Sequence, residues 1–207
     1  MPSDVDNYFA DTEPAVRHLF EALHEYDALT VPPSLGKYAD DRGVVIMNRE
    51  QALGYMQELS GSLALDFAKA TLCGSIAQVA YMALKQYSTN DTIDDDCARF
   101  NVAQGSKVAK FCVGRRVHGI PVGLLIYAAR VQYNHWEEGT PTNPVPNAVL
   151  GALYTHYAND LAFDMAYVLD WPSPRPVAHY ILRHELRWMS YGEYIQDMRD
   201  ALSEVAA

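Results

Sequence analysis

The sequence predicts an all-α protein that forms a single domain, a bundle of about five to seven helices. Apolar residues recur at helical spacing along most of the chain. Residues 64–87 are apolar on nearly every side, as expected of a helix in the middle of a bundle. The sequence contains no repeat, no low-complexity tract and no convincing set of alternating strands.

The first helix is expected after a polar lead-in over residues 1–12. Thr12 is its predicted N-cap, and Pro14 falls in the first turn, where the N–H that proline lacks would have no helical partner. The apolar stripe ends near Leu29, before a Val-Pro-Pro sequence that stops the helix and begins a loop. Residues 1–47 should therefore form a helix and a loop that pack on the bundle.

A long helical tract follows, with Asn48 as its predicted N-cap. We expect Ser60-Gly61-Ser62 either to kink this tract or to divide it in two. The central part, residues 64–87, carries several small residues, Gly74 among them. Small residues on a central helix allow another backbone to come close.

The next connection is predicted to be partly helical. Residues 88–96 form a polar, acidic turn region in which Thr92 or Asp94 can cap a helix. Apolar residues recur at helical spacing from 97 to 113. The glycine and proline within residues 118–121 mark a break before the following helix.

The C-terminal third is expected to add two helices. Three prolines within residues 139–146 predict a loop, after which Asn147 is predicted to cap a helix that ends near Leu169. These elements complete an expected bundle over residues 48–170. A proline-rich connector then leads to an amphipathic helix within residues 177–207, which can pack on the bundle or on a second subunit.

Charge and cysteine content narrow the class of function. The net charge of −10 weakens long-range attraction to nucleic acid, so a general DNA or RNA binder is disfavoured and DNA is not an expected partner. An enzyme that contacts one phosphate locally remains compatible with this charge. Three cysteines without a CxxC pair suit a reducing cytoplasm. With no secretion signal and no apolar run of about 18–20 residues recognised, we expect a cytoplasmic protein without a membrane segment.

The polar end of the helix after Pro121 carries the clearest chemical pattern. An apolar segment turns polar at Arg130, and His135 follows five residues later. A guanidinium can hold phosphate oxygens while an imidazole moves a proton. The spacing alone has low specificity, because about one such pair is expected by chance in a chain of this composition. A helix end that simply becomes solvated is the competing interpretation.

In this setting the stretch AARVQYNHWEEG resembles the motif of the HEPN superfamily, an arginine followed after a few residues by a histidine. The tract CGSIAQVAYMALKQYSTND also looks like a core helix of such domains. The resemblance covers about residues 63–169. It implies a generally dimeric all-α domain whose active members cleave RNA without metal, in a cleft between the motif helices of two subunits. Many members act as toxins or in defence against phage.

Carried onto this chain, the resemblance gives a metal-independent endoribonuclease of a toxin or anti-phage defence system. Arg130 would stabilise the phosphorane and His135 would act as general acid or base. Tyr133 and Asn134 are candidate supporting donors. The implied partners are an RNA substrate, a second copy of the chain and a protein partner or antitoxin, and no cofactor or metal is required.

Two alternatives remain open. Val131 stands where the family commonly has Asn, Asp or His, which favours a non-catalytic helical protein-interaction module with a degenerate motif. A metal-binding bundle is the third hypothesis, although Glu21-x-x-His24 has no second copy. His156, Asp160 and Asp164 share a helical face but are better explained as a hydrogen-bonded polar stripe.

Helix geometry adds a constraint on the arginine–histidine pair. Five residues of a straight helix turn through about 500°, which leaves the two side chains about 140° apart and about 7.5 Å apart along the axis. They converge only if the helix ends or bends near Asn134, if the arginine folds over, or if they act across a dimer.

Overall fold

The computed structural model describes residues 3–29, 47–135, 143–157 and 176–203, and the side chains of 56–63 lie outside this description. The chain is mostly helical, so the all-α prediction is confirmed. The long helices are α1 (Asp4–Leu29), α2 (Arg49–Tyr87), α4 (Val122–His135), α5 (Pro144–Tyr157) and α7 (Tyr191–Ser203). The short elements are α3 (Asp95–Ala98), the 3₁₀ helix η2 (Lys107–Phe111), strands β1 (Arg116–Val117) and β2 (Ile120–Pro121), α6 (Ala178–Tyr180) and the π-helical turn η4 (Ile181–Glu185).

Helix α1 begins at Asp4, so the predicted polar lead-in and the Thr12 cap are wrong. Ser3 and Asp6 close the N-terminus reciprocally, because the Ser3 hydroxyl accepts from the Asp6 amide and the Asp6 carboxylate accepts from the Ser3 amide, both at 3.2 Å. Phe9 is buried and extends the apolar stripe toward the N-terminus, ahead of Thr12. The Thr12 hydroxyl instead donates to a carbonyl one turn back, at 2.8 Å. The predicted end of the helix at Leu29 is confirmed.

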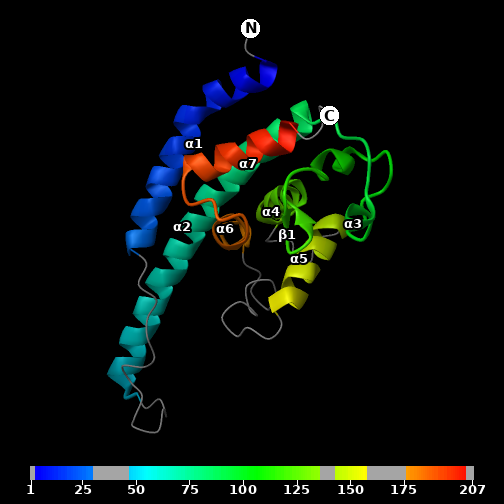
Figure 1. Cartoon of the computed structure of the whole chain (residues 1–207). Coiled ribbons are helices and arrows are strands. Elements are labelled where there is room, and N and C mark those ends of the chain that lie inside the picture. The colour runs from blue at the N-terminus through cyan, green and yellow to red at the C-terminus, as the bar shows by residue number, and fades with distance from the viewer. Residues whose placement is uncertain (1–2, 30–46, 136–142, 158–175, 204–207) are drawn as a thin grey trace.

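Helix α2 is the central element of the bundle (Figure 1). Asn48 caps it as predicted: its side chain accepts from the Gln51 amide and the Gln51 side chain accepts from the Asn48 amide, both at 2.9 Å. The helix runs without a break through residues 60–62, so the predicted division there is wrong. Helix α1 packs antiparallel against the C-terminal half of α2, where the Tyr8 hydroxyl donates to the Val79 carbonyl at 2.9 Å.

Within α2, the segment Ala64–Tyr87 is long and apolar enough to cross a membrane by length and composition alone. The expectation that the sequence holds no apolar run of membrane length is therefore wrong for this segment. In the structure, half of an 18-residue apolar stretch of this segment is buried. Helices α1, α4 and α6 pack against α2. A buried central helix of a bundle has the same apolar composition as a membrane span.

The helix expected over residues 97–113 is replaced by two short elements. Asp94 caps α3, with its carboxylate accepting from the Cys97 amide at 2.7 Å, as one of the two predicted caps. Asn101 and Gly105 have φ values of 60° and 72°, which a right-handed helix cannot accommodate. The chain then forms η2 and an antiparallel hairpin that pairs Val117 with Ile120.

The last helices also differ from the prediction. Helix α5 begins at Pro144 rather than after Asn147, since the Asn143 side chain accepts from the Val145 amide at 3.1 Å. Several predicted segments lie outside the described residues. They are the continuation of this helix to Leu169, most of the 139–146 loop, the loop after Leu29 and most of the proline-rich connector. The final helix is split into α6, η4 and α7 by a non-helical segment in which Arg187 has φ 56°.

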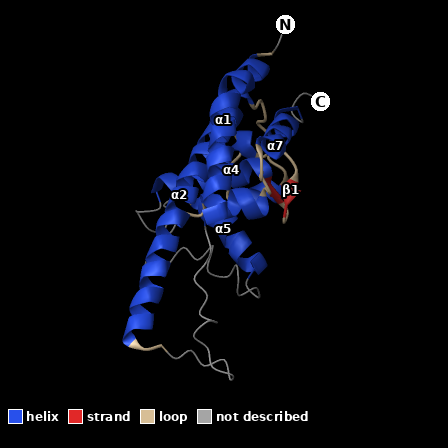
Figure 2. Ribbon diagram, turned by 90° about the vertical axis from the view of Figure 1, so that its left-hand side faces the viewer, coloured by secondary structure: helices blue, strands red, loops and turns tan. Residues whose placement is uncertain are grey.

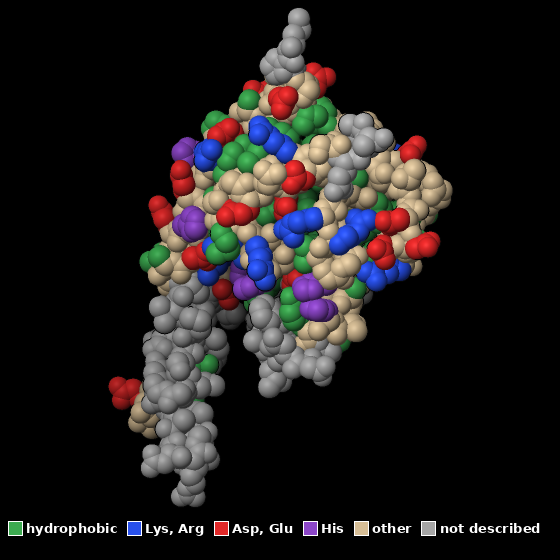
Figure 3. All heavy atoms as spheres, in the orientation of Figure 1, with side chains coloured by type: hydrophobic (Ala, Val, Ile, Leu, Met, Phe, Trp, Pro, Cys, Tyr) green, Lys and Arg blue, Asp and Glu red, His purple; other side chains and the backbone are tan. Residues whose placement is uncertain are grey.

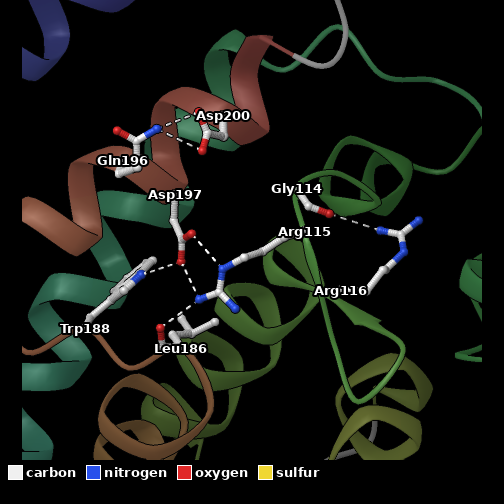
Figure 4. A network of polar contacts seen from close by, with 8 residues as sticks. All are labelled: Gly114, Arg115, Arg116, Leu186, Trp188, Gln196, Asp197 and Asp200. Atoms are coloured by element: carbon white, nitrogen blue, oxygen red, sulfur yellow. Dashed lines mark hydrogen bonds and ion pairs between the residues drawn. The ribbon is translucent and has the colours of Figure 1, made fainter.

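Arg115, next to the hairpin, is joined to the C-terminal segment by an ion pair and a further hydrogen bond (Figure 4). Arg115 holds the Asp197 carboxylate with Nε and Nη2, each at 2.8 Å, and also donates to the Leu186 carbonyl. The indole of the fully buried Trp188 donates to the same carboxylate at 2.8 Å. The short hairpin is thereby fixed beside α7 at one side of the bundle (Figure 2).

Candidate functional site

The predicted motif begins at the polar end of α4, where Arg130 is half-buried against α2. Its Nε donates to the Gln78 side chain at 2.9 Å, and its Cζ lies 4.8 Å from the centre of the Tyr81 ring. With its amide oxygen turned to the guanidinium, Asn134 accepts from Nη2 at 3.1 Å. The structure therefore brings Arg130 and Asn134 together and turns the guanidinium toward α2.

Tyr133, expected from the sequence only as a supporting donor, packs its ring against α2. Its ring lies directly on Gly74 of α2, where an added Cβ would be only 2.5 Å from the ring. The absence of a side chain at Gly74 thus makes room for an aromatic ring rather than for another backbone. Tyr133 is half-buried and holds the start of the motif's last turn against α2.

His135 is the last residue of α4 and is exposed. Since α4 stays helical through His135, it does not end at Asn134, and Arg130 and His135 leave the helix about 140° apart. Arg130 is directed toward Gln78 and Tyr81.

A pocket of about 510 Å³ lies beside Tyr81, whose ring contacts the guanidinium of Arg130. Its aromatic wall consists of Tyr81, Phe111 and Tyr127. Phe111 stacks on Tyr81 with 4.9 Å between ring centres, and Tyr127 lies 5.1 Å from Phe111. The Tyr127 hydroxyl accepts from Asn143 at 2.8 Å, and burial raises the pKa of this tyrosine. Tyr127 therefore contributes as a neutral ring.

Three of the chain's five lysines line the same pocket: Lys85, Lys107 and Lys110. Lys110 donates to the Lys85 carbonyl at 3.0 Å, and the Lys85 ammonium lies 5.8 Å from the centre of the Tyr81 ring. Across the described residues, none of the three forms an ion pair with a carboxylate. An otherwise acidic protein thus carries a local cationic pocket with aromatic walls, and we call it the lysine pocket.

The local fold explains how this pocket forms and why it was missed. A 3₁₀ helix has three residues per turn, so Lys107 and Lys110 of η2 lie above one another. Phe111 follows them and packs on α2 and α4. In the sequence, the pocket is indicated only by two lysines three residues apart, Lys107 and Lys110. The α-helix predicted for this segment would not have placed them next to Tyr127.

The described residues support a metal site or a reactive thiol less well than they support the lysine pocket. In the described portion no group of three His, Cys, Asp or Glu side chains is arranged to hold a metal ion. Asp160 and Asp164 lie outside the described residues. All three cysteines are free: burial raises the pKa of Cys73 to about 12, while a hydrogen bond from Cys97 lowers the pKa of Cys112.

Comparison of the chain with protein-family models, with curated proteins and with solved structures gives no match. The function proposed below therefore depends on the residues and geometry of this chain.

Proposed function

We propose that the protein is a HEPN-like, metal-independent endoribonuclease whose substrate lies across the Arg130 end of α4 and the lysine pocket. The observation that carries the proposal is the gathering of three lysines and Arg130 around one aromatic wall in an acidic chain. Lysines contact phosphates, and aromatic rings stack unpaired bases, so this combination suits single-stranded RNA.

The reaction needs no metal, because the 2′-hydroxyl of the RNA attacks the adjacent phosphorus and displaces the 5′-oxygen of the next nucleotide. The products are a 2′,3′-cyclic phosphate and a 5′-hydroxyl. Arg130 stabilises the charge that develops on the phosphorane, and His135 transfers a proton to or from the reacting oxygens. In a dimer, α4 of one copy supplies Arg130 and α4 of the other supplies His135.

The test is incubation of the purified protein with a mixed RNA pool in EDTA. We expect cyclic-phosphate ends, no action on DNA, and a rate about 10²–10⁴-fold lower for His135→Ala. Lys107→Gln with Lys110→Gln should weaken binding and reduce the slope of log affinity against log salt by about two. Arg17→Gln is the control, since Arg17 is exposed on α1 and paired with Glu13 at 2.7 Å. An intact RNA pool, or equal cutting by His135→Ala, refutes the enzyme proposal.

Assembly and biological setting follow from the same proposal. A shared cleft requires a dimer, so light scattering at tens of micromolar should give twice the 23.1 kDa chain mass. A monomer at this concentration removes the cross-subunit mechanism. For a toxin or defence nuclease, expression of the wild-type chain should slow growth, whereas expression of His135→Ala should not.

A non-catalytic interaction module is the second candidate function. The contacts of Arg130 with Gln78, Tyr81 and Asn134 favour it, because a guanidinium held within its own chain can be a structural residue. This function predicts that Arg130→Ala lowers the melting temperature, with no RNA cleavage by any variant. An unchanged melting temperature together with lost cleavage favours the nuclease.

A further inference from the structure

A second pocket, of about 440 Å³, lies between α5, the hairpin and the residues that follow α3. Its polar lining consists of Arg99, His118, Thr155 and His156, and small residues of α5 form much of the remaining wall. Figure 3 shows histidine side chains gathered over the hairpin and α5, with Lys and Arg side chains close by. We call this the histidine pocket.

Behind the histidine pocket lies a buried carboxylate. The side chain of Glu185 is fully buried, and its Oε2 lies 3.2 Å from Nε2 of His118. The Tyr157 hydroxyl donates to the same oxygen at 3.3 Å. The His118 ring in turn stacks on His156, with 3.7 Å between ring centres. A carboxylate is retained in the core although burying one is costly without a charged or hydrogen-bonding partner.

Two departures from regular backbone geometry bring these groups together. His118 occupies the first position of a two-residue hairpin turn with φ 50°, a position that favours Gly, Asn or Asp. Glu185 ends a π-helical turn, which is rare and occurs often at functional sites. The first departure places His118 in the lining of the pocket, and the second places Glu185 next to His118.

The polar side chains that line the histidine pocket can all donate hydrogen bonds, and Arg99 is a cation. Arg99 donates to the Gly119 carbonyl at 2.9 Å with one nitrogen, Nη2, and its guanidinium lies 4.7 Å from the centre of the Phe100 ring. Within the described ranges Arg99 forms no ion pair, and no carboxylate lines the pocket. Glu185 does not line the pocket itself and lies next to His118, where it orients the ring.

We propose that the histidine pocket binds a small ligand through a phosphate group. A guanidinium, two imidazoles and a hydroxyl lining one pocket offer more donors than a planar carboxylate can use, and a tetrahedral phosphate has acceptors for all of them. The pocket volume falls within the range of about 300–1,000 Å³ of small-molecule sites. Glu185 acts as a positioning residue, because its carboxylate lies 3.2 Å from Nε2 of His118 and fixes the orientation of the ring.

The test is a titration of the full chain, labelled at its histidines, with inorganic phosphate at constant ionic strength. We expect saturable shifts of the His118 and His156 imidazole resonances, with those of the exposed His18 and His24 unchanged. Acetate should cause no saturable shift. Ribose 5-phosphate should act as phosphate does, and tighter binding than inorganic phosphate would identify a phosphate monoester as the ligand.

Variants assign the binding to this pocket. Arg99→Gln removes an exposed charge and should weaken phosphate binding about 10-fold or more, which corresponds to 1.4 kcal/mol. The matched control Arg17→Gln removes an exposed charge on α1, outside both pockets, and should leave the affinity unchanged. Glu185→Gln should weaken binding and broaden the His118 resonance; if it fails to fold, Arg99→Gln still decides the question. The proposal is refuted if phosphate shifts neither histidine, or if Arg99→Gln binds as well as the wild type.

Discussion

Replacing Gly74 by alanine probes the contact that seats the last turn of α4 on α2. The added Cβ would lie 2.5 Å from Cδ1 of Tyr133 and 2.6 Å from two further ring atoms, whereas ordinary contacts begin at 3.4 Å. The ring must therefore move by about 0.9 Å (3.4 − 2.5), and overpacking of this kind costs about 1–3 kcal/mol. The better helix propensity of alanine offsets about 1 kcal/mol of this loss in unfolding free energy.

Gly54 provides the matched control, because it lies on the same helix and has no atom within 4 Å of an added Cβ. Gly54→Ala should raise the free energy of unfolding by about 0.5–1 kcal/mol through helix propensity alone. We expect Gly74→Ala to be about 1–3 kcal/mol less stable than Gly54→Ala. Urea unfolding followed by circular dichroism measures this difference, with the m-value as a check on two-state behaviour.

A double-mutant cycle isolates the contact. In a Tyr133→Ala background the obstructing ring is absent, so Gly74→Ala should change sign and become stabilising, as Gly54→Ala is. Because Tyr133 lies between Arg130 and Asn134 in the sequence, displacing its ring should also reduce RNA cleavage more in Gly74→Ala than in Gly54→Ala. Equal stability of the two alanine variants, or an unchanged sign in the Tyr133→Ala background, would refute this account of the packing.

Three further predictions concern other parts of the chain. Asp197→Ala should cost about 1–3 kcal/mol of unfolding free energy, measured in urea, because it leaves the buried Trp188 indole N–H without its acceptor. Burial lowers the pKa of His179 to about 4, so its contribution to stability is complete above about pH 6.5 and declines as pH falls toward 4. Between pH 7.5 and 5 the wild type should therefore lose about 2 kcal/mol more than His179→Gln, measured by chemical unfolding. Thiol titration of the native protein should modify Cys112 before Cys73, and equal rates would contradict the opposite shifts of their pKa values.

The long helices were predictable because their apolar periodicity is continuous and their caps are local. Asn48 and Asp94 are short polar residues whose side chains satisfy the first free amides; the sequence predicted Asn48 as a cap and Asp94 as one of two candidate caps. Ser3 has the same role through Asp6, but the helix was sought only after Thr12. The signal for the true start was therefore present and local.

The errors fall where the backbone leaves the right-handed helix without an interruption in the apolar pattern. Asn101 and Arg187 take positive φ values although neither is glycine, and the flanking apolar residues continue as they would in a helix. Periodicity cannot detect such positions, because the change in direction is stabilised by distant contacts. Arg115, for example, is far away in the sequence and donates to the Leu186 carbonyl at 2.8 Å, next to Arg187.

The same irregular backbone supplies the side chains of both candidate pockets. The connection between α2 and α4 contributes Lys107 and Lys110 to the lysine pocket, and Arg99 and His118 to the histidine pocket. The helices form a rigid frame around this connection. Its short turns direct polar side chains to the surface, where ligands can reach them. Helical periodicity could therefore predict the frame and the Arg130 end of α4, but neither pocket, since both depend on turns within residues 95–121 that a helical assignment conceals.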